Sequence, residues 1–194
     1  MAHPKWIMHD SLSFSDRVRS CAEGIAESGA SALSGLYDLT AQRLLRFAVT
    51  ITRNQHDAED AVQASLVRVV SDVHLLRRAN CPWAYLLRMV RNEALVILRR
   101  KRRWSLLENL TDLLTRRSVD QLEQEDTFRA VWLALRKLPA EQSEVVVLKI
   151  WEELTFAQIA EVLSVPPATA ASRYRYALEK LAAQLRDHEV EVEL

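Results

Sequence analysis

The sequence predicts an all-α protein built from two small helical domains joined by an acidic linker. Apolar residues recur at steps of three and four over most of the 194-residue chain, which is the period of an amphipathic helix. All three glycines lie within the first 35 residues, so tight hairpins and glycine-rich phosphate loops are disfavoured. Hydrophobic residues make up 49% of the chain, which is enough to bury a core.

Periodicity and charge divide the chain into five segments. Residues 1–28 are weakly periodic and are interpreted as a loosely attached extension. Helical periodicity covers residues 29–103, weakens over 104–126, where acidic residues accumulate, and returns over 127–187. Residues 188–194 form an acidic tail. We therefore expect two domains, at 29–103 and 127–187, with a partly helical linker between them.

The first domain has the pattern of successive amphipathic helices. One or two helices are expected over residues 33–51, and another over 57–73 with Ala58, Val62 and Val69 on its inner face. Pro82 then occupies a favoured first-turn position of a further helix. Trp83 lies on the apolar stripe of that helix.

Positive charge is concentrated in this last helix and in the residues just before it. Residues 77–103 contain nine basic residues and one acidic residue in a chain of zero net charge. Such a density attracts phosphates by Coulomb forces and counterion release, whereas the helix dipole accounts for only one or two of these residues. Trp83, Tyr85 and Trp104 add rings on which unpaired bases could stack. For Trp83, core packing is an equally good interpretation.

The helix over residues 57–73 has a second, outward-facing strip. Asp60, Gln63, Ala64 and Val67 are spaced so that they form one contiguous surface. An exposed valine between small and polar residues is compatible with a protein contact. Isolated apolar surface residues are also common, so an ordinary solvated face is the alternative.

The second domain carries a helix-turn-helix pattern. Helices are expected to begin near residues 139, 155 and 167. Thr155 and Gln158 have the spacing of a capping box at the start of one helix. Ser164 begins the turn, and Pro167 takes the first position of the second helix.

The second helix of this motif has a polar face near its amino end. This face holds Thr169, Ser172, Arg173 and Tyr176, with Arg175 beside it. Short hydroxyls and arginines at such a position can reach base edges and phosphates in the major groove. The alternative is a helical hairpin with an ordinary polar outer face.

Three segments, in the right order and spacing, resemble the small two-domain sigma factors of the extracytoplasmic-function (ECF) type. Residues 57–63 resemble the family's polymerase-binding helix. Residues 82–94 and the following Arg/Lys run resemble the segment that melts and binds the minus-ten element. Residues 138–173 resemble the domain that reads the minus-thirty-five element. The resemblance covers most of residues 30–186.

The resemblance implies a sigma region 2-like bundle and a sigma region 4-like helix-turn-helix domain. It implies a cytoplasmic factor that binds core RNA polymerase and directs promoter recognition, promoter melting and transcription initiation. Opening DNA then needs no enzymatic chemistry and no cofactor, only binding energy that favours the melted state. The implied partners are the β′ clamp helices of core polymerase and promoter DNA, and an anti-sigma factor is an additional partner that the resemblance allows.

The resemblance also assigns three sets of contact residues. The polymerase-binding set is Asp57, Glu59, Asp60, Gln63 and Val67. The minus-ten set is Trp83, Tyr85, Arg88, Arg91, Asn92, Arg99, Arg100, Arg102 and Arg103. The minus-thirty-five set is Thr169, Ser172, Arg173, Arg175 and Tyr176.

The chain departs from the family pattern at five positions. Ala64 stands where an acid is usual, Val96 where an aspartate is common, and Ser164 where a glycine is common. Ala170 and Ala171 replace a bulky aliphatic residue and a lysine in the recognition helix. These departures bear on promoter preference and, to a lesser degree, on polymerase binding.

Other classes of protein have less support. The two cysteines lack metal-ligand spacing, no catalytic triad or paired-carboxylate motif is evident, and no stretch is long and apolar enough for membrane insertion. Two alternatives stay open: a helix-turn-helix regulator that does not engage polymerase, and an adaptor or anti-factor whose basic run is a solvated surface.

Overall fold

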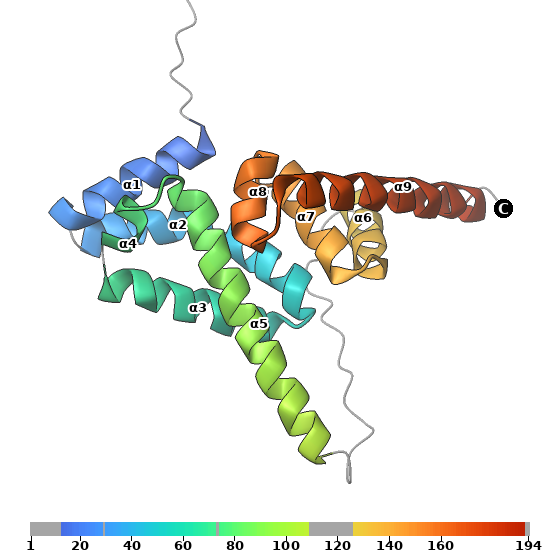
Figure 1. Ribbon diagram of the computed structural model, residues 1–194, viewed down its shortest axis with the longest axis horizontal. Coiled ribbons are helices and arrows are strands. Elements are labelled where there is room, and N and C mark those ends of the chain that lie inside the picture. Colours follow the sequence, from blue (N-terminus) through green and yellow to red (C-terminus); the bar gives the residue numbers. More distant parts are fainter. Residues whose placement is uncertain (1–12, 29, 73, 109–125, 193–194) are drawn as a thin grey trace, which may run out of the picture.

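The computed structural model describes residues 13–28, 30–72, 74–108 and 126–192, and every regular element in these ranges is an α-helix. The helices are α1 (Phe14–Ser28), α2 (Ala30–Thr52), α3 (Gln55–Ser71), α4 (His74–Arg77), α5 (Pro82–Glu108), α6 (Asp126–Lys137), α7 (Ala140–Ile150), α8 (Phe156–Leu163) and α9 (Pro167–Val192). The predicted all-α class is confirmed, and Figure 1 shows the arrangement.

Helices α1–α5 form the first helical body, with α2 packed against α1, α3 and α5. Its core includes Leu36, Phe47 and Leu87, all fully buried. The predicted inner face of α3 is confirmed, since Ala58, Val62 and Val69 are among its buried residues. The predicted start of a helix at Pro82 is also confirmed. These apolar stripes fix which faces of α3 and α5 remain available to partners.

Helix α5 is longer than the sequence pattern suggests. The periodicity weakens from residue 104, but α5 continues to Glu108. Its carboxyl-terminal part projects beyond the other helices in Figure 1, and the basic residues from Arg99 to Arg103 are exposed there. The rest of the predicted linker, residues 109–125, lies outside the described residues, as do 1–12 and 193–194.

The interpretation of residues 1–28 as loosely attached is wrong for residues 14–28. These form α1, which packs against α2, α4 and α5 and buries Val18, Ala22 and Ile25. Arg19 also donates a hydrogen bond to the carbonyl oxygen of Asn80, in the segment before α5. The buried residues repeat at steps of four and three, so one side of α1 belongs to the core of the first body.

Helices α6–α9 form the second body. The predicted starts near residues 139, 155 and 167 are confirmed by α7, α8 and α9. Its core includes Leu138, Leu148, Ile159 and Ala177. Helix α9 packs against α6, α7 and α8 and continues as a long helix toward the end of the chain (Figure 1).

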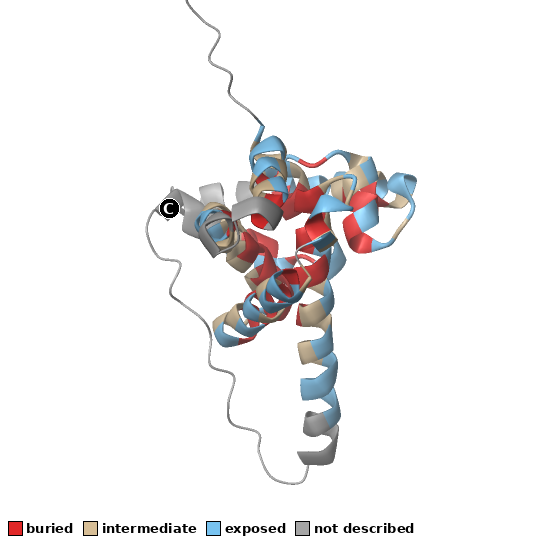
Figure 2. Cartoon of the chain, turned by 90° about the vertical axis from the view of Figure 1, so that its left-hand side faces the viewer, coloured by how far each residue is buried: buried red, intermediate tan, exposed pale blue. Residues whose placement is uncertain are grey.

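The two bodies pack directly on each other. Helix α7 lies against α2, and α8 lies against α5. Arg53 Nη2 donates to the carbonyl oxygen of Leu138 over 3.1 Å, and Gln158 Nε2 lies 3.5 Å from Cys81 Sγ. Figure 2 shows buried residues gathered where the helices meet and exposed residues along the projecting end of α5. We call this packing the closed arrangement.

Candidate nucleic-acid interface

One face of α5 presents a row of polar and basic side chains. Arg88, Asn92, Arg99 and Arg103 follow each other at steps of four, seven and four, and all four are exposed. Side chains at such steps lie on one face of a helix. Arg100 and Arg102 are exposed beside this row, whereas Tyr85 is half-buried at its start. The resulting surface can bind phosphates along the length of α5.

A basic hollow lies near the projecting end of α5. Val96, Arg99, Arg100 and Arg103 line a surface cavity of about 480 Å³. Val96 is 41% exposed, so it supplies an apolar surface among three guanidinium groups. A carboxylate at this position would instead partly neutralise the hollow. The sequence pattern located the charges but not the hollow.

The structure buries Trp83 in the core of the first body. Its side chain is fully buried, and the Phe14 ring packs edge-on against it with a centroid distance of 4.8 Å. The Trp83 ring therefore has no free face for a base in this arrangement, and core packing accounts for it. Its indole N–H has no hydrogen-bond acceptor among the described residues, which makes this burial costly.

Arg91 faces the second body instead of solvent. Its Nε lies 2.6 Å from Glu144 Oε2 on α7, and the side chains of Arg91 and Glu144 are 15% and 4% exposed. Burial raises the pKa of Glu144, against the opposing attraction of Arg91. The closed arrangement thus withholds one predicted minus-ten residue from DNA.

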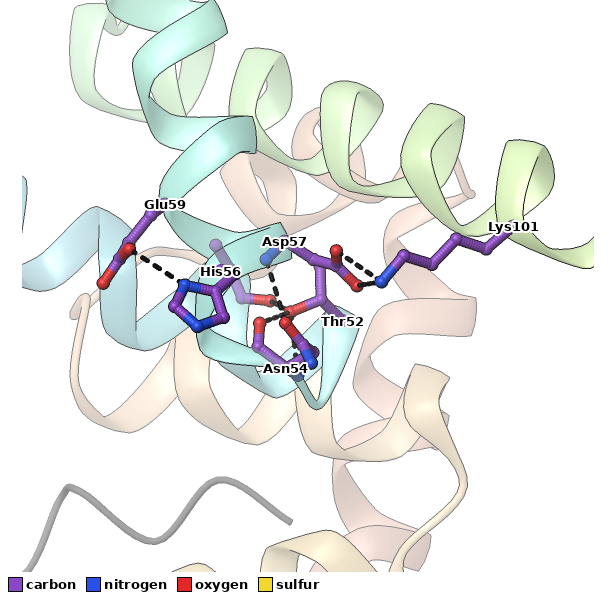
Figure 3. A network of polar contacts seen from close by, with 7 residues as sticks. Thr52, Asn54, His56, Asp57, Glu59 and Lys101 are labelled. Carbon is purple, nitrogen blue, oxygen red and sulfur yellow. Dashed lines mark hydrogen bonds and ion pairs between the residues drawn. The ribbon is translucent and has the colours of Figure 1, made fainter. Parts of the chain in front are cut away.

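Helix α3 meets the end of α5 through a buried carboxylate. Asp57 is buried, and Lys101 Nζ lies 2.7 and 2.8 Å from its two carboxylate oxygens. Asn54 caps α3 by accepting a hydrogen bond from the backbone N–H of Asp57 (Figure 3). The Asp57 side chain is therefore engaged within the protein. Neither the spacing nor the resemblance indicated its contact with Lys101.

The outward strip of α3 is accessible. Asp60 and Gln63 are exposed, and Val67 is 62% exposed. Val70, one turn further along, is 51% exposed and extends the strip with a second apolar side chain. Glu59 is half-buried and accepts a hydrogen bond from Gln55 at 2.9 Å. Val70 was missed because it was assigned no face in the sequence pattern.

The helix-turn-helix geometry in α8 and α9 agrees with the sequence prediction. Thr155 and Gln158 form both hydrogen bonds of a capping box at the start of α8. Ser164 adopts the left-handed conformation, with φ 56° and ψ 48°, and ends that helix. Pro167 then begins α9. This sharp turn places the amino end of α9 beyond the end of α8.

The polar face of α9 is only partly free. Ser172, Arg175 and Tyr176 are exposed, and the Arg175 guanidinium lies 5.0 Å from the centroid of the Tyr176 ring. Thr169 is half-buried. Arg173 Nη2 lies 2.6 Å from Glu141 Oε2 on α7. One predicted minus-thirty-five arginine is thus held by a carboxylate of its own domain.

A second buried carboxylate joins the two bodies. Glu152, in the turn between α7 and α8, has a fully buried side chain that lies 3.4 Å from Arg43 and 3.6 Å from Arg46 of α2. Burial raises the pKa of Glu152, against the attraction of both arginines. The Arg43 guanidinium also lies 3.8 Å from the centroid of the Phe14 ring. This contact connects α1, α2 and the second body.

Two family models match the chain, one over the first body and one over the second. Residues 36–104 match the family model described as Sigma-70 region 2, and residues 128–181 match the model described as Sigma-70, region 4. Together the two models cover more than half of the chain. The chain is an RNA polymerase sigma factor of the ECF type.

Curated relatives include several sigma factors. The chain is 26% identical to the ECF RNA polymerase sigma factor SigW of Bacillus subtilis over 187 residues, which covers 88% of this chain and 97% of SigW. It is 26% identical to the RNA polymerase sigma factor SigV of the same organism over 145 residues, which covers 74% of this chain and 85% of SigV.

Two solved structures share the fold of this chain. The sigma factor RpoE in complex with the anti-sigma factor NepR from Bartonella quintana matches with a TM-score of 0.68 at 20% identity, covering 79% of this chain and 96% of that chain. CnrH in complex with the cytosolic domain of CnrY matches with a TM-score of 0.61 at 23% identity, covering 89% and 99%. Both bodies of this sigma factor therefore have the architecture found in these proteins.

Two further features are absent from the described residues of this sigma factor. The residues that the structure describes hold no group of three or more His, Cys, Asp or Glu side chains arranged for a metal ion. Within the same ranges, no helix combines the length and apolar character needed to cross a membrane. What the described residues do present is charge and shape at the surfaces of α3, α5 and α9.

Proposed function

We propose that this sigma factor binds core RNA polymerase through α3, the minus-ten element through α5, and the minus-thirty-five element through α9. The observation that carries the proposal is the separation of three exposed faces on three helices, in the order of the region 2 and region 4 matches. A regulator that only binds operators would need the face on α9 but not the strip on α3.

The polymerase contact is proposed for Asp60, Gln63 and Val67, with Glu59 at the edge and Val70 added by the structure. The strip combines a carboxylate, an amide and two exposed valines. Apolar side chains that remain exposed within a polar rim are a common feature of protein–protein interfaces. Asp57 is not part of the exposed strip, because it is buried against Lys101, and this ion pair holds the start of α3 against α5.

The minus-ten contact is proposed for the exposed face of α5. Arg88, Asn92 and the arginines of the projecting end would hold phosphates, and Tyr85 would lie near separated bases. Arg91 joins this set only after it leaves Glu144. Trp83 supports α5 from the core.

The minus-thirty-five contact is proposed for Thr169, Ser172, Arg173, Arg175 and Tyr176 on α9. The first turns of a recognition helix are the part that enters the major groove. With Ala170 fully buried against the domain core, the readout depends on the side chains around it. The factor acts in the cytoplasm with polymerase and without catalysis of its own.

An anti-sigma protein is included among the proposed partners. One solved neighbour is the sigma factor RpoE in complex with the anti-sigma factor NepR, and the other is CnrH in complex with the cytosolic domain of CnrY. Such a partner would act on the same surfaces that polymerase and promoter need.

The polymerase contact is tested by capture of core RNA polymerase on the immobilised sigma factor. Asp60→Arg combined with Gln63→Ala should reduce capture about tenfold or more, because it reverses a charge at the centre of the strip. Asp38→Arg with Gln42→Ala makes the same changes on exposed positions of α2 and should leave capture unchanged. Capture at the wild-type level by both double variants would show that α3 is not the docking surface.

A further inference from the structure

Helix α7 holds one arginine from each proposed promoter-binding surface. Glu144 lies 2.6 Å from Arg91 of α5, and Glu141 lies 2.6 Å from Arg173 of α9. Glu141 and Glu144 are three positions apart, so they lie on the same face of α7. We call these two carboxylates the acidic pair.

The four charged groups form one cluster. Arg91, Glu141 and Arg173 all influence the pKa of Glu144, so each of them lies within electrostatic reach of this carboxyl group. The Arg91–Glu144 contact crosses between the two bodies, whereas the Arg173–Glu141 contact stays within the second body. The cluster therefore joins α7 to α5 through Arg91 and to α9 through Arg173.

We propose that the acidic pair of α7 takes the place of DNA phosphates at Arg91 and Arg173, and that Glu144 of this pair holds the free factor in a closed arrangement that binds DNA less tightly. This inference rests on the proposed DNA roles of Arg91 and Arg173. A carboxylate and a phosphate oxygen offer a guanidinium the same charge-assisted hydrogen bonds. Promoter DNA and a carboxylate cannot occupy the same guanidinium together, so DNA binding by Arg91 requires the two bodies to separate at α7, whereas Arg173 has only to leave Glu141 within the second body.

The ion pair between Arg91 and Glu144 can be broken without a large loss of stability when another anion replaces the carboxylate. Burial raises the pKa of Glu144 despite its arginine partner, so the loss of hydration outweighs the attraction. Buried ion pairs of this kind add little net stability, although removing one partner is costly. Glu152 between Arg43 and Arg46 is a second contact of the same kind between the bodies. A highly charged ligand that offers phosphates to both arginines can replace such contacts.

Opening is measured on the purified full chain by small-angle X-ray scattering. Glu144→Lys places a cation against Arg91 and should increase the radius of gyration. Arg91→Glu breaks the same contact from the first body and should have the same effect. Glu161→Lys makes the same charge change at an exposed position of α8 and should leave the radius of gyration unchanged. Circular dichroism verifies that each variant keeps its helices.

A charge-swapped variant distinguishes loss of the Arg91–Glu144 ion pair from a general loss of structure. Arg91→Glu combined with Glu144→Arg restores an ion pair in reversed order and should return the radius of gyration toward that of the wild type. If both single variants are folded and keep the wild-type radius of gyration, Glu144 does not hold the closed arrangement and the proposal is overturned.

Masking is measured by fluorescence anisotropy with a random-sequence 25-base-pair duplex. Glu144→Lys should bind this duplex about threefold or more tightly than Glu161→Lys, because a larger fraction of the protein is open. A larger radius of gyration in Glu144→Lys without tighter DNA binding would overturn the proposed masking of Arg91. That outcome would not bear on the polymerase contact of α3. If the wild-type factor fails to capture core polymerase, the proposed polymerase contact is overturned, and the scattering result is unaffected.

Discussion

The carboxyl groups of Glu144 and Glu152 are buried and have lost much of their hydration. Both lie beside arginines of the first body, and burial raises the pKa of each carboxyl group above its ordinary value. A carboxyl group whose pKa is higher in the folded than in the unfolded state binds its proton more tightly when folded. The tighter proton binding therefore stabilises the folded protein fully at pH values below the pKa of the unfolded state. This stabilisation is lost as the pH rises through the pKa of the folded state.

This sign gives a pH prediction for Glu144→Gln. The amide resembles the protonated carboxyl and does not ionise, so the variant should gain stability relative to the wild type as pH rises above the ordinary value of 4.5. Urea unfolding midpoints measured from pH 4.5 to 8 test this. Glu161→Gln at an exposed position of α8 should show no such trend. A relative gain for the wild type with rising pH would contradict the direction of the shift.

The exposed arginines of α5 should each contribute to the salt dependence of DNA binding. Arg99→Ala with Arg103→Ala removes two basic side chains from one face, so the slope of log affinity against log salt should fall by about two. Arg77→Ala with Arg78→Ala removes the same charge from exposed positions outside the proposed minus-ten set. The slope is measured with a duplex probe from 50 to 300 mM salt. An equal change in both double variants would show that net charge, and not the face of α5, determines binding.

Helical spacing predicted which residues share a face, but not which side chains come from distant parts of the chain to cover that face. Trp83 was equally compatible with core packing and base contact, and the decision came from Phe14 of α1. Arg91 was correctly placed on α5, but its partner, Glu144, is 53 residues away in sequence. Contacts of this kind depend on how the elements pack, which spacing along one helix does not encode.

At the scale of elements, the turn between α8 and α9 was the most predictable feature. The capping residues Thr155 and Gln158 act on the backbone beside them, so their spacing alone specifies the hydrogen bonds that the structure shows. Ser164 was noted as a departure from a common glycine, and its φ of 56° gives the physical reason. A serine in the left-handed region has steric strain that glycine lacks.

Ser164→Gly should therefore stabilise the second body by about 0.5–1 kcal/mol. The free energy of unfolding in urea is the measurement. Ser172→Gly makes the same substitution inside α9, where glycine lowers helix stability, and should have the opposite sign. Destabilisation by Ser164→Gly would mean that the turn does not adopt this conformation in solution.

Helix α1 was the least predictable element. The buried positions Val18, Ala22 and Ile25 do follow a helical period, but polar and small residues between them weaken the average signal. Phe14 contacts Trp83 of α5 and the guanidinium of Arg43 in α2, and Arg43 in turn reaches Glu152 of the second body.

Phe14→Ala should lower the free energy of unfolding by about 2 kcal/mol, less than for a fully buried phenylalanine because the ring is half-buried. Thermal or urea unfolding tests the loss. Phe14→Leu keeps much of the apolar volume and should recover most of the stability. If the alanine variant matches the wild type, α1 is attached as loosely as its weak periodicity suggests.

At the scale of the whole molecule, the two domains were predictable but their contact was not. Each domain has its own hydrophobic pattern, whereas the contact between them uses polar groups such as Arg43, Glu152 and Arg53. In the closed arrangement, Asp60, Gln63 and Val67 remain exposed while Arg91 is held by Glu144. The surface proposed for polymerase is therefore accessible in the closed arrangement, whereas Arg91 and Arg173 of the surfaces proposed for DNA are engaged within the protein.

Run-off transcription on genomic fragments tests most directly whether this sigma factor directs polymerase to promoters. Core polymerase supplemented with the factor should produce transcripts of defined length that core polymerase alone does not produce. The Asp60→Arg, Gln63→Ala variant should lose these transcripts, and the Asp38→Arg, Gln42→Ala control should keep them. The same transcripts with and without the factor, over a full set of fragments, would contradict its assignment to promoter-directed initiation.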